Sequence, residues 1–224
     1  MSGCRKREMV ETGRPEAGHI CTDPLARRSL LCATGIALAI GAFPPLRAQA
    51  SEPAGLVEDV KGEVYAESGN ARRALERNSP VFEADLVITG AASRLMINLG
   101  EQTGLWLGEQ VRINIDRYRV DTGGEFRLET GAMLFDRPSA KPASVQIHSP
   151  YGLIAVRGTR FFAGPSKGVF GVFVKRGAVS VTAAGREVVL LMGQGTDIAN
   201  PGDKPITARR WGDQRIHQAL ESVL

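Results

Sequence analysis

The stretch that most constrains the fold runs from Tyr151 to Gly177. β-Branched and aromatic residues dominate it, glycine and proline interrupt it at short intervals, and its apolar residues show no helical period. This pattern predicts several consecutive core strands. Arg157 and Gly158 break an apolar run in which a regular strand needs neither residue. The break predicts a bulge or sharp turn, with the glycine at positive φ or close to another backbone.

Earlier parts of the chain show the alternation of half-buried strands. Apolar and polar residues alternate from Val111 to Tyr118 and again from Phe126 to Thr130, with the turn sequence Asp-Thr-Gly-Gly between them. We therefore expect antiparallel strands with one face packed on the core and the other exposed to solvent. The basic segment from Arg72 to Arg77 is expected to be a solvated sheet edge, because charge at an edge blocks unwanted pairing.

Three glycines occupy similar sequence contexts and form a weak internal repeat. Gly62, Gly131 and Gly177 each stand two residues before an apolar position expected in a strand. Their spacings of 69 and 46 residues do not fit a strict solenoid period. We therefore expect a single all-β domain of many short strands, forming a roll or sandwich with pseudo-repeats and followed by a short C-terminal helix.

The first fifty residues have the pattern of an export signal. Arg27 and Arg28 precede an uncharged segment, Leu30 to Phe43, and Ala48 to Ala50 supplies a small-residue cleavage site. These features predict a signal peptide of the twin-arginine type over residues 1–50.

The alternative for this segment is a membrane anchor. An anchor needs about 20 apolar residues, whereas this one is broken at Pro44. No comparable apolar run follows, so we expect no retained membrane span. The mature chain, beginning at Ser51, is expected to be soluble and periplasmic or secreted in a bacterium.

Removal of the leader would change both the net charge and the cysteine count of the chain. The leader holds +3 of the net charge of +4, so the mature chain is nearly neutral and gives no reason to expect nucleic-acid binding. All three cysteines, Cys4, Cys21 and Cys32, also lie in the leader. The mature chain therefore has no disulfide, thiolate metal site or cysteine nucleophile. Its 174 residues suffice for one domain with a sizeable core.

The mature chain is expected to have three parts. Residues 51–59 lead into the fold, residues 60–199 form the β domain, and residues 200–224 form a linker and helix. The segment from Arg137 to Ser144 is the most linker-like part inside the domain, but it is not expected to be a domain boundary. Thr207 is expected to cap the closing helix. The apolar side of that helix, expected to pack on the β domain, contains Trp211, Ile216, Ala219, Leu220 and Val223.

The central motif resembles the signature of the FecR-domain proteins. It consists of Val156-Arg157-Gly158-Thr159, an aromatic residue, a variable hairpin, and a second strand that ends in Gly177-Ala178-Val179. Upstream, Asp85 to Gly90 and Ser93 to Gly100 are similar to the family's earlier turn and strand. The resemblance covers Val60 to Ile198 and implies a free-standing exported β module for protein interaction or signalling.

In that family, a membrane-spanning segment connects the β domain to a cytoplasmic tail that binds a sigma factor. This sequence departs from the pattern, because we expect neither a retained span nor a cytoplasmic tail. Direct sigma-factor control is therefore not implied, and the expected partner is an unknown envelope protein.

Two interpretations of Arg157 remain open. Its guanidinium either satisfies backbone carbonyls or a carboxylate inside the fold, or it recognises a partner's carboxylate. The structural interpretation is favoured, because a charge inside an apolar motif must be satisfied internally. Gly158 would then supply the turn geometry, and the hydroxyl of Thr159 would satisfy turn backbone.

The mature chain has few residues suited to catalysis or metal binding. The mature chain has two histidines, His148 and His217, without metal-ligand spacing, and it has no nucleophile elbow or phosphate-binding loop. We therefore expect no enzyme activity, no metal and no cofactor. The alternative function is binding of an envelope glycan such as peptidoglycan. Exposed Trp106 and Tyr118 rings would stack on the sugars.

Overall fold

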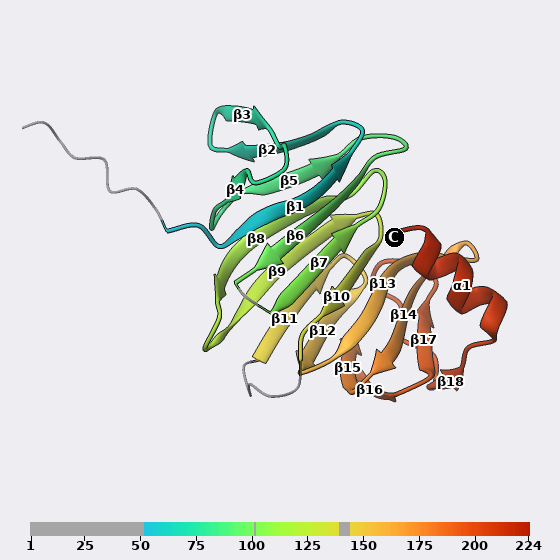
Figure 1. Ribbon diagram of the computed structural model, residues 1–224. Coiled ribbons are helices and arrows are strands. Elements are labelled where there is room, and N and C mark those ends of the chain that lie inside the picture. The colour runs from blue at the N-terminus through green and yellow to red at the C-terminus, as the bar shows by residue number, and fades with distance from the viewer. Residues whose placement is uncertain (1–51, 101, 139–143) are drawn as a thin grey trace, which may run out of the picture. The chain divides into compact units, whose positions relative to one another are not determined.

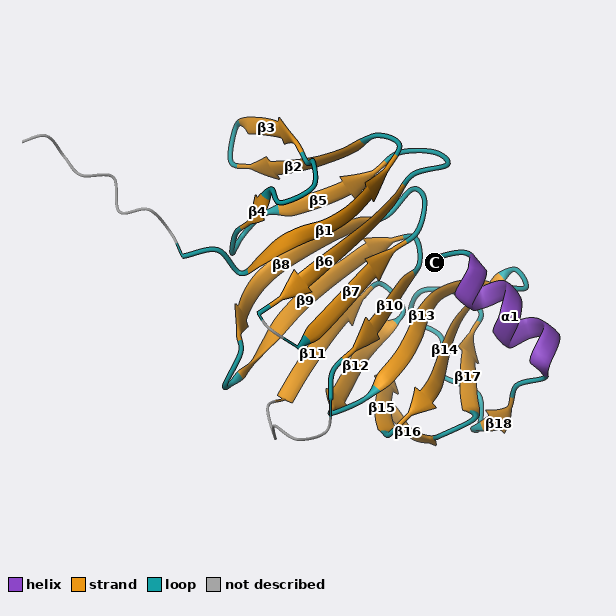
Figure 2. Cartoon of the chain, in the orientation of Figure 1, coloured by secondary structure: helices purple, strands orange, loops and turns teal. Residues whose placement is uncertain are grey.

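The computed structural model describes residues 52–100, 102–138 and 144–224, which belong to one compact unit, Ala48–Leu224. The expected signal peptide and positions 139–143 of the linker-like segment lie outside the described residues. The described residues form two β-sheets and a short C-terminal helix (Figures 1 and 2). The expected all-β class with a closing helix is confirmed.

Each sheet has nine strands. In spatial order, sheet A contains β18 (Arg209–Arg210), β17 (Gln194–Ile198), β14 (Val169–Arg176), β13 (Arg160–Ser166), β10 (Met133–Asp136), β7 (Thr103–Leu107), β6 (Arg94–Leu99), β1 (Gly55–Lys61) and β4 (Pro80–Val81). Sheet B contains β16 (Arg186–Leu191), β15 (Ala178–Ala183), β12 (Gly152–Arg157), β11 (Ser144–Ser149), β9 (Gly123–Thr130), β8 (Arg112–Arg119), β5 (Leu86–Thr89), β2 (Val64–Ser68) and β3 (Ala71–Ala74).

Hairpins placed alternately in the two sheets build most of this order. β11 and β12 pair in sheet B, β13 and β14 in sheet A, and β15 and β16 again in sheet B. β11 runs parallel to β9 because β10, which lies between them in the sequence, crosses into sheet A. The chain therefore builds a sandwich by adding each new hairpin beside the previous hairpin of the same sheet.

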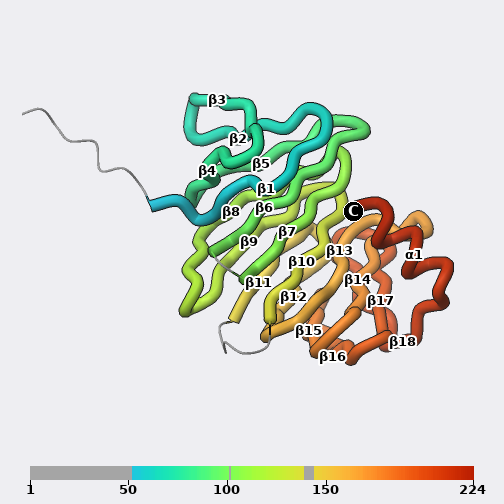
Figure 3. Tube along the Cα trace, viewed as in Figure 1, coloured from blue at the N-terminus to red at the C-terminus, as the bar shows by residue number. Residues whose placement is uncertain are grey.

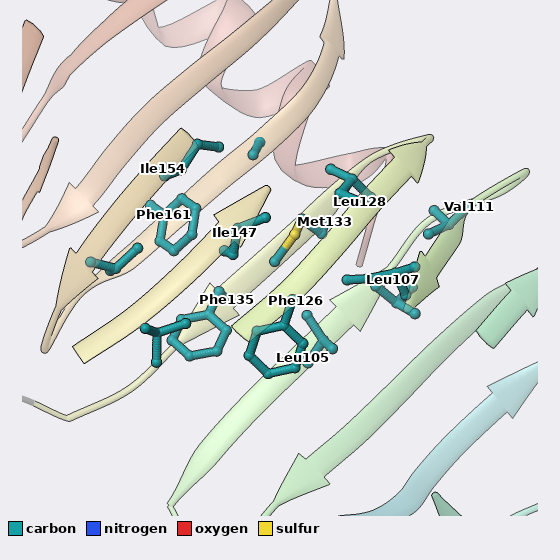
Figure 4. Packing of buried hydrophobic residues seen from close by; sticks show 14 of the residues in the cluster. Leu105, Leu107, Val111, Phe126, Leu128, Met133, Phe135, Ile147, Ile154 and Phe161 are labelled. Carbon is teal, nitrogen blue, oxygen red and sulfur yellow. The ribbon is translucent and has the colours of Figure 1, made fainter. Parts of the chain in front are cut away.

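The main core lies between the sheets. In Figure 4, Phe126 and Leu128 of β9 lie opposite Leu105 of β7 and Met133 and Phe135 of β10. All five side chains are buried. The alternation predicted from Val111 to Tyr118 is confirmed, because its apolar positions face this core. Burial of such apolar surface is the main stabilising contribution to a fold of this kind.

The three glycines of the internal repeat lie where the chain passes from one sheet to the other. Gly62 joins β1 to β2, Gly131 joins β9 to β10, and Gly177 joins β14 to β15, with φ angles of 77°, 85° and 86°. The Cα trace in Figure 3 follows these changes of layer. Since side chains with a Cβ rarely adopt such angles, glycine is favoured at each crossing. The predicted pseudo-repeat is therefore a repeated way of passing between sheets.

Helix α1 (Asp213–Glu221) covers part of the outer face of sheet A (Figure 1). A second buried cluster lies beneath it, formed by Ala132, Leu134, Phe162, Phe173, Trp211, Ala219 and Val223, with Ile216 and Leu220 packed against them. The predicted packing of the helix on the β domain is confirmed.

The predicted start of the helix is wrong. Its N-cap is Gly212 rather than Thr207, because Arg209 and Arg210 form β18, which pairs with β17. Trp211 lies between β18 and the helix, yet it is buried. The sheet therefore extends into the expected linker.

The sheet also begins earlier than the boundary expected at residue 60. β1 starts at Gly55 and pairs with both β4 and β6. Most of the segment 51–59 is therefore part of the sandwich. Its partners are more than 20 residues away in the sequence, so the local pattern did not show them.

Candidate functional site

The FecR-like motif lies where the chain passes from sheet B to sheet A. β12 ends at Arg157, Gly158 is buried with a φ of 62°, and β13 begins at Arg160. The expected glycine turn is therefore present. It separates two strands that lie in different sheets.

A second crossing lies beside the first and runs in the opposite direction. A Cβ added to Gly177 would lie 2.6 Å from Cγ2 of Thr159 and 2.9 Å from the carbonyl oxygen of Gly158. The crossing at the motif and the later crossing at Gly177 therefore contact each other and form one local structure. We call Gly158, Thr159 and Gly177 the paired crossing.

Thr159 supports the paired crossing mainly by packing. The residue is fully buried, and its carbonyl oxygen accepts a hydrogen bond of 3.0 Å from the backbone N–H of Arg137. Its hydroxyl has no hydrogen-bond partner among the described residues. The predicted contact of that hydroxyl with turn backbone is therefore not seen, whereas its methyl group fits against Gly177.

Arg157 is exposed at the end of β12. Within ranges 52–100, 102–138 and 144–224, its guanidinium makes no hydrogen bond or ion pair. The internal partner assumed in the structural interpretation is therefore not seen there. The side chain is placed where it can meet another molecule.

Other charged residues stabilise the crossing. The Asp136 carboxylate lies 2.7 Å from Nη2 of Arg176 and 3.3 Å from Nη1 of Arg160. The next residue, Arg137, is buried, and its Nη2 donates a hydrogen bond of 2.5 Å to the carbonyl oxygen of Val120. Sequence reasoning missed this network. The available signal was the Asp136-Arg137 pair directly after the apolar run Met133 to Phe135.

Tyr118 is buried in the main core. Its hydroxyl donates to Oγ1 of Thr103 at 2.8 Å and lies 3.3 Å from the carbonyl oxygen of Leu99. Burial raises the pKa of Tyr118, while the hydrogen bond to Thr103 and the charge of Arg137 act in the opposite direction. The ring is not at the surface, where stacking on a sugar would require it.

Trp106 is half-buried on the outer face of sheet A. Its ring lies over Gly104, because a Cβ there would be 2.4 Å from Cη2 of the indole. The guanidinium carbon of Arg160 lies 5.6 Å from the ring centroid. Trp106 and Tyr118 therefore do not form a pair of exposed coplanar rings, the arrangement that would favour the glycan alternative.

Groups suited to catalysis or metal binding are not gathered at the motif. Among the described residues, no set of three or more His, Cys, Asp or Glu side chains is placed to hold a metal ion. His148 lies 2.8 Å from Glu125 and His217 lies 3.0 Å from Glu221, on different elements of the fold. The described helix is too short and too polar to cross a membrane.

These features define a mostly antiparallel β-sandwich whose signature motif forms a sheet crossing. Residues 85–180 match the family model described as FecR protein. This segment of the chain is therefore similar to a FecR domain. The matched range runs from the start of β5 into β15 and includes Gly158, Thr159 and Gly177.

Solved structures share this fold. Two crystal structures of a proposed anti-sigma factor from Parabacteroides distasonis superpose with a TM-score of 0.51 at 14% sequence identity. The alignments cover 60% of this chain and 64% and 63% of those chains. This chain thus spans less than two thirds of the length of the proteins it resembles. No curated protein matches it in sequence.

Proposed function

We propose that the protein is an exported FecR-type module that binds an envelope protein during signalling. The FecR match over residues 85–180 carries this proposal, because it includes the whole paired crossing. The fold shared with a proposed anti-sigma factor is consistent with a regulatory role.

The placement of polar and apolar groups supports contact with a macromolecule. Asp136, Arg137, Arg160 and Arg176 are used to hold strands together. Large apolar side chains are exposed elsewhere, notably Val189, Leu191 and Met192. A module whose charged groups stabilise its own turns is better suited to binding than to catalysis. We therefore propose no enzymatic reaction, metal or cofactor.

The proposed place of action is the periplasm or the outside of the cell. Arg27 and Arg28, the apolar segment after them and the site ending at Ala50 support twin-arginine export. Export by this route delivers proteins that have already folded, which suits a sandwich whose strand pairs are far apart in the sequence.

Affinity capture tests the proposed function. The tagged full chain would be expressed in its native bacterium, isolated from the envelope fraction and compared with an unrelated exported protein carrying the same tag. We expect one specific protein to be recovered in stoichiometric amount after chemical cross-linking. Recovery of peptidoglycan fragments without such a protein would contradict the proposal and support the glycan alternative.

A further inference from the structure

The two sheets have four edge strands, and three of them are poor templates for pairing. β4 has two residues, one of them Pro80, and β18 consists only of Arg209 and Arg210. β3 carries Arg72 and Arg73, as the basic sequence predicted for an edge. Short strands, proline and charge are the usual means by which sheet edges avoid pairing with other chains.

The fourth edge, β16, has none of these protections along most of its length. It has six residues, Arg186 to Leu191, and in the described part of the chain it pairs only with β15. Val189 and Leu191 are 55% and 56% exposed, and Met192, directly after the strand, is 68% exposed. Half of the exposed large apolar side chains in the described residues therefore lie within four positions at this edge.

The backbone geometry shows which groups of β16 face outward. β15 and β16 are joined by Ala184 and Gly185, whose φ angles of 47° and 74° fit a two-residue hairpin turn. The residue pair next to such a turn is hydrogen-bonded, and the bonding then alternates along the strands. The peptide groups of Glu187, Val189 and Leu191 consequently point away from β15.

One of these outward groups already has a partner. The backbone N–H of Leu191 donates a hydrogen bond of 2.9 Å to Oε1 of Gln194, which agrees with its direction away from β15. Glu187 and Val189 therefore offer the N–H and C=O groups that an added strand requires.

The charges at the two ends of β16 indicate which kind of added strand would fit this edge. Arg186 is exposed at the start of β16. At the other end, exposed Arg210 pairs with Gln194, and the N–H of Trp211 donates to the carbonyl of Gly193 at 3.3 Å. Glu187, the acidic residue of the strand, accepts a hydrogen bond from Ser180. An incoming strand would thus meet apolar side chains flanked by arginines.

These charges disfavour a second copy of the chain as the occupant. If two β16 strands paired antiparallel about Val189, Arg186 of each would lie opposite Met192 of the other, toward the end of the edge where Arg210 pairs with Gln194. Like charges placed together across an interface oppose association. A strand with apolar residues at alternate positions and carboxylates between them is complementary instead.

We propose that β16 is a docking edge, at which an extended acidic segment of a partner protein joins sheet B as an additional strand. This inference rests on the proposed protein-binding function and specifies its surface and the chemistry of its partner. The backbone groups of Glu187 and Val189 provide the pairing, Val189, Leu191 and Met192 the apolar contact, and the flanking arginines the charge preference.

A defined peptide tests the docking edge. The probe is a fluorescent peptide of about nine alternating valine and glutamate residues, a usual strand length, and its control has lysine in place of glutamate. We expect the acidic peptide to bind the purified full chain and to slow hydrogen exchange at the amides of Glu187 and Val189. Equal binding of the lysine peptide, or protection confined to other strands, would overturn the proposal.

Variants of Val189 separate backbone pairing from apolar contact. Val189→Pro removes the outward N–H, and we expect about tenfold weaker peptide binding. Val189→Thr keeps that N–H and is expected to bind more tightly than the proline variant. Val189→Glu is a second test that leaves the backbone intact, and it should repel the acidic probe. Unchanged affinity in folded Val189→Pro and Val189→Glu would rule out docking at β16.

Two further measurements separate this inference from the proposed function. If the wild-type chain captures a specific envelope protein and folded Val189→Pro captures it equally well, the function stands and the docking edge is wrong. If the wild type recovers only peptidoglycan, the function itself fails. A wild-type dimer that Val189→Pro abolishes in sedimentation would assign the edge to a second copy and overturn the partner proposed here.

Discussion

At the scale of single residues, Gly177 combines two constraints that can be separated. Its φ of 86° disfavours any side chain, and a Cβ would also meet Thr159 at 2.6 Å. Gly168 has a similar φ of 80°, but nothing lies within 4 Å of its Cβ position. The two glycines therefore form a matched pair for measuring the steric contribution of the paired crossing.

We expect Gly177→Ala to destabilise the protein more than Gly168→Ala. The left-handed conformation alone costs about 1–2 kcal/mol for a residue with a Cβ, and Gly177→Ala adds the clash with Thr159. Thermal unfolding would measure the difference, since each kcal/mol shifts the midpoint by about 2–4 °C in a chain of this size. Adding Thr159→Ser, which removes the clashing methyl group, should restore part of the loss. Equal midpoints for the two alanine variants would contradict this account.

We expect Tyr118 to contribute to a decrease in the free energy of unfolding at alkaline pH. Burial raises its folded pKa above the ordinary value of 10.0, so the unfolded chain releases the phenolic proton first as pH rises. This contribution is fully present below about pH 10 and is lost as pH rises through the folded pKa. We expect Tyr118→Phe to lose about 1 kcal/mol at neutral pH with its hydrogen bond to Thr103. The decline of its stability above pH 10 should also be shallower than in the wild type. Urea unfolding from pH 8 to 11 would test this, and parallel curves would show that Tyr118 does not contribute.

The charged residues show what a local pattern can and cannot reveal. Arg157 was singled out because it interrupts an apolar run, yet it is exposed. The arginines that hold the crossing, Arg160 and Arg176, converge on Asp136 only because β13 pairs with both β10 and β14. That convergence brings together side chains up to 40 residues apart in the sequence. Alternation within one strand does not contain this information.

At the scale of elements, period-two alternation and glycine turns predicted the strands well. They also agree with the predicted roll or sandwich, because short strands with one apolar face need a second sheet to cover it. The start of α1 was harder to predict. The polar and basic residues before Trp211 fit a capped helix equally well, and pairing with β17 decided that Arg209 and Arg210 form a strand.

Trp211 connects α1 with sheet A. Its ring stacks on Phe173 with a centroid separation of 5.2 Å, and it lies against Gly171 and Gly195, where a Cβ would come within 2.8 Å and 2.3 Å of the indole. The guanidinium carbon of Arg215 lies 3.6 Å from the ring centroid. The indole thus fills the space that these two glycines leave open.

We expect Trp211→Ala to cost about 3–5 kcal/mol, because it empties a well-packed site. The half-buried Trp106 is the control, and Trp106→Ala should cost less. Urea unfolding would give both values, and limited proteolysis should cut the Trp211→Ala variant first within α1. Similar losses in the two variants would mean that the helix does not depend on Trp211.

At the scale of the whole molecule, charge and cysteine are distributed unevenly between the first fifty residues and the β-sandwich. The first fifty residues carry +3 of the net charge of +4 and all three cysteines. The β-sandwich is therefore nearly neutral and has no thiol. Its interactions must come from shape, apolar surface and local charge, as at β16, rather than from a general basic field.

Export provides the last prediction. Twin-arginine transport depends on the adjacent arginines before the apolar segment, and lysine keeps their charge while losing the guanidinium geometry. Changing Arg27 and Arg28 together to lysine should therefore leave the precursor in the cytoplasm, whereas the wild type should reach the periplasm with Ser51 as its first residue. Cell fractionation and N-terminal sequencing would measure both outcomes, and Arg5→Lys with Arg7→Lys, which changes arginines far from the apolar segment, is the matched control. Normal export of the Arg27 and Arg28 variant would rule out this route, and a retained leader in the periplasmic protein would rule out cleavage after Ala50.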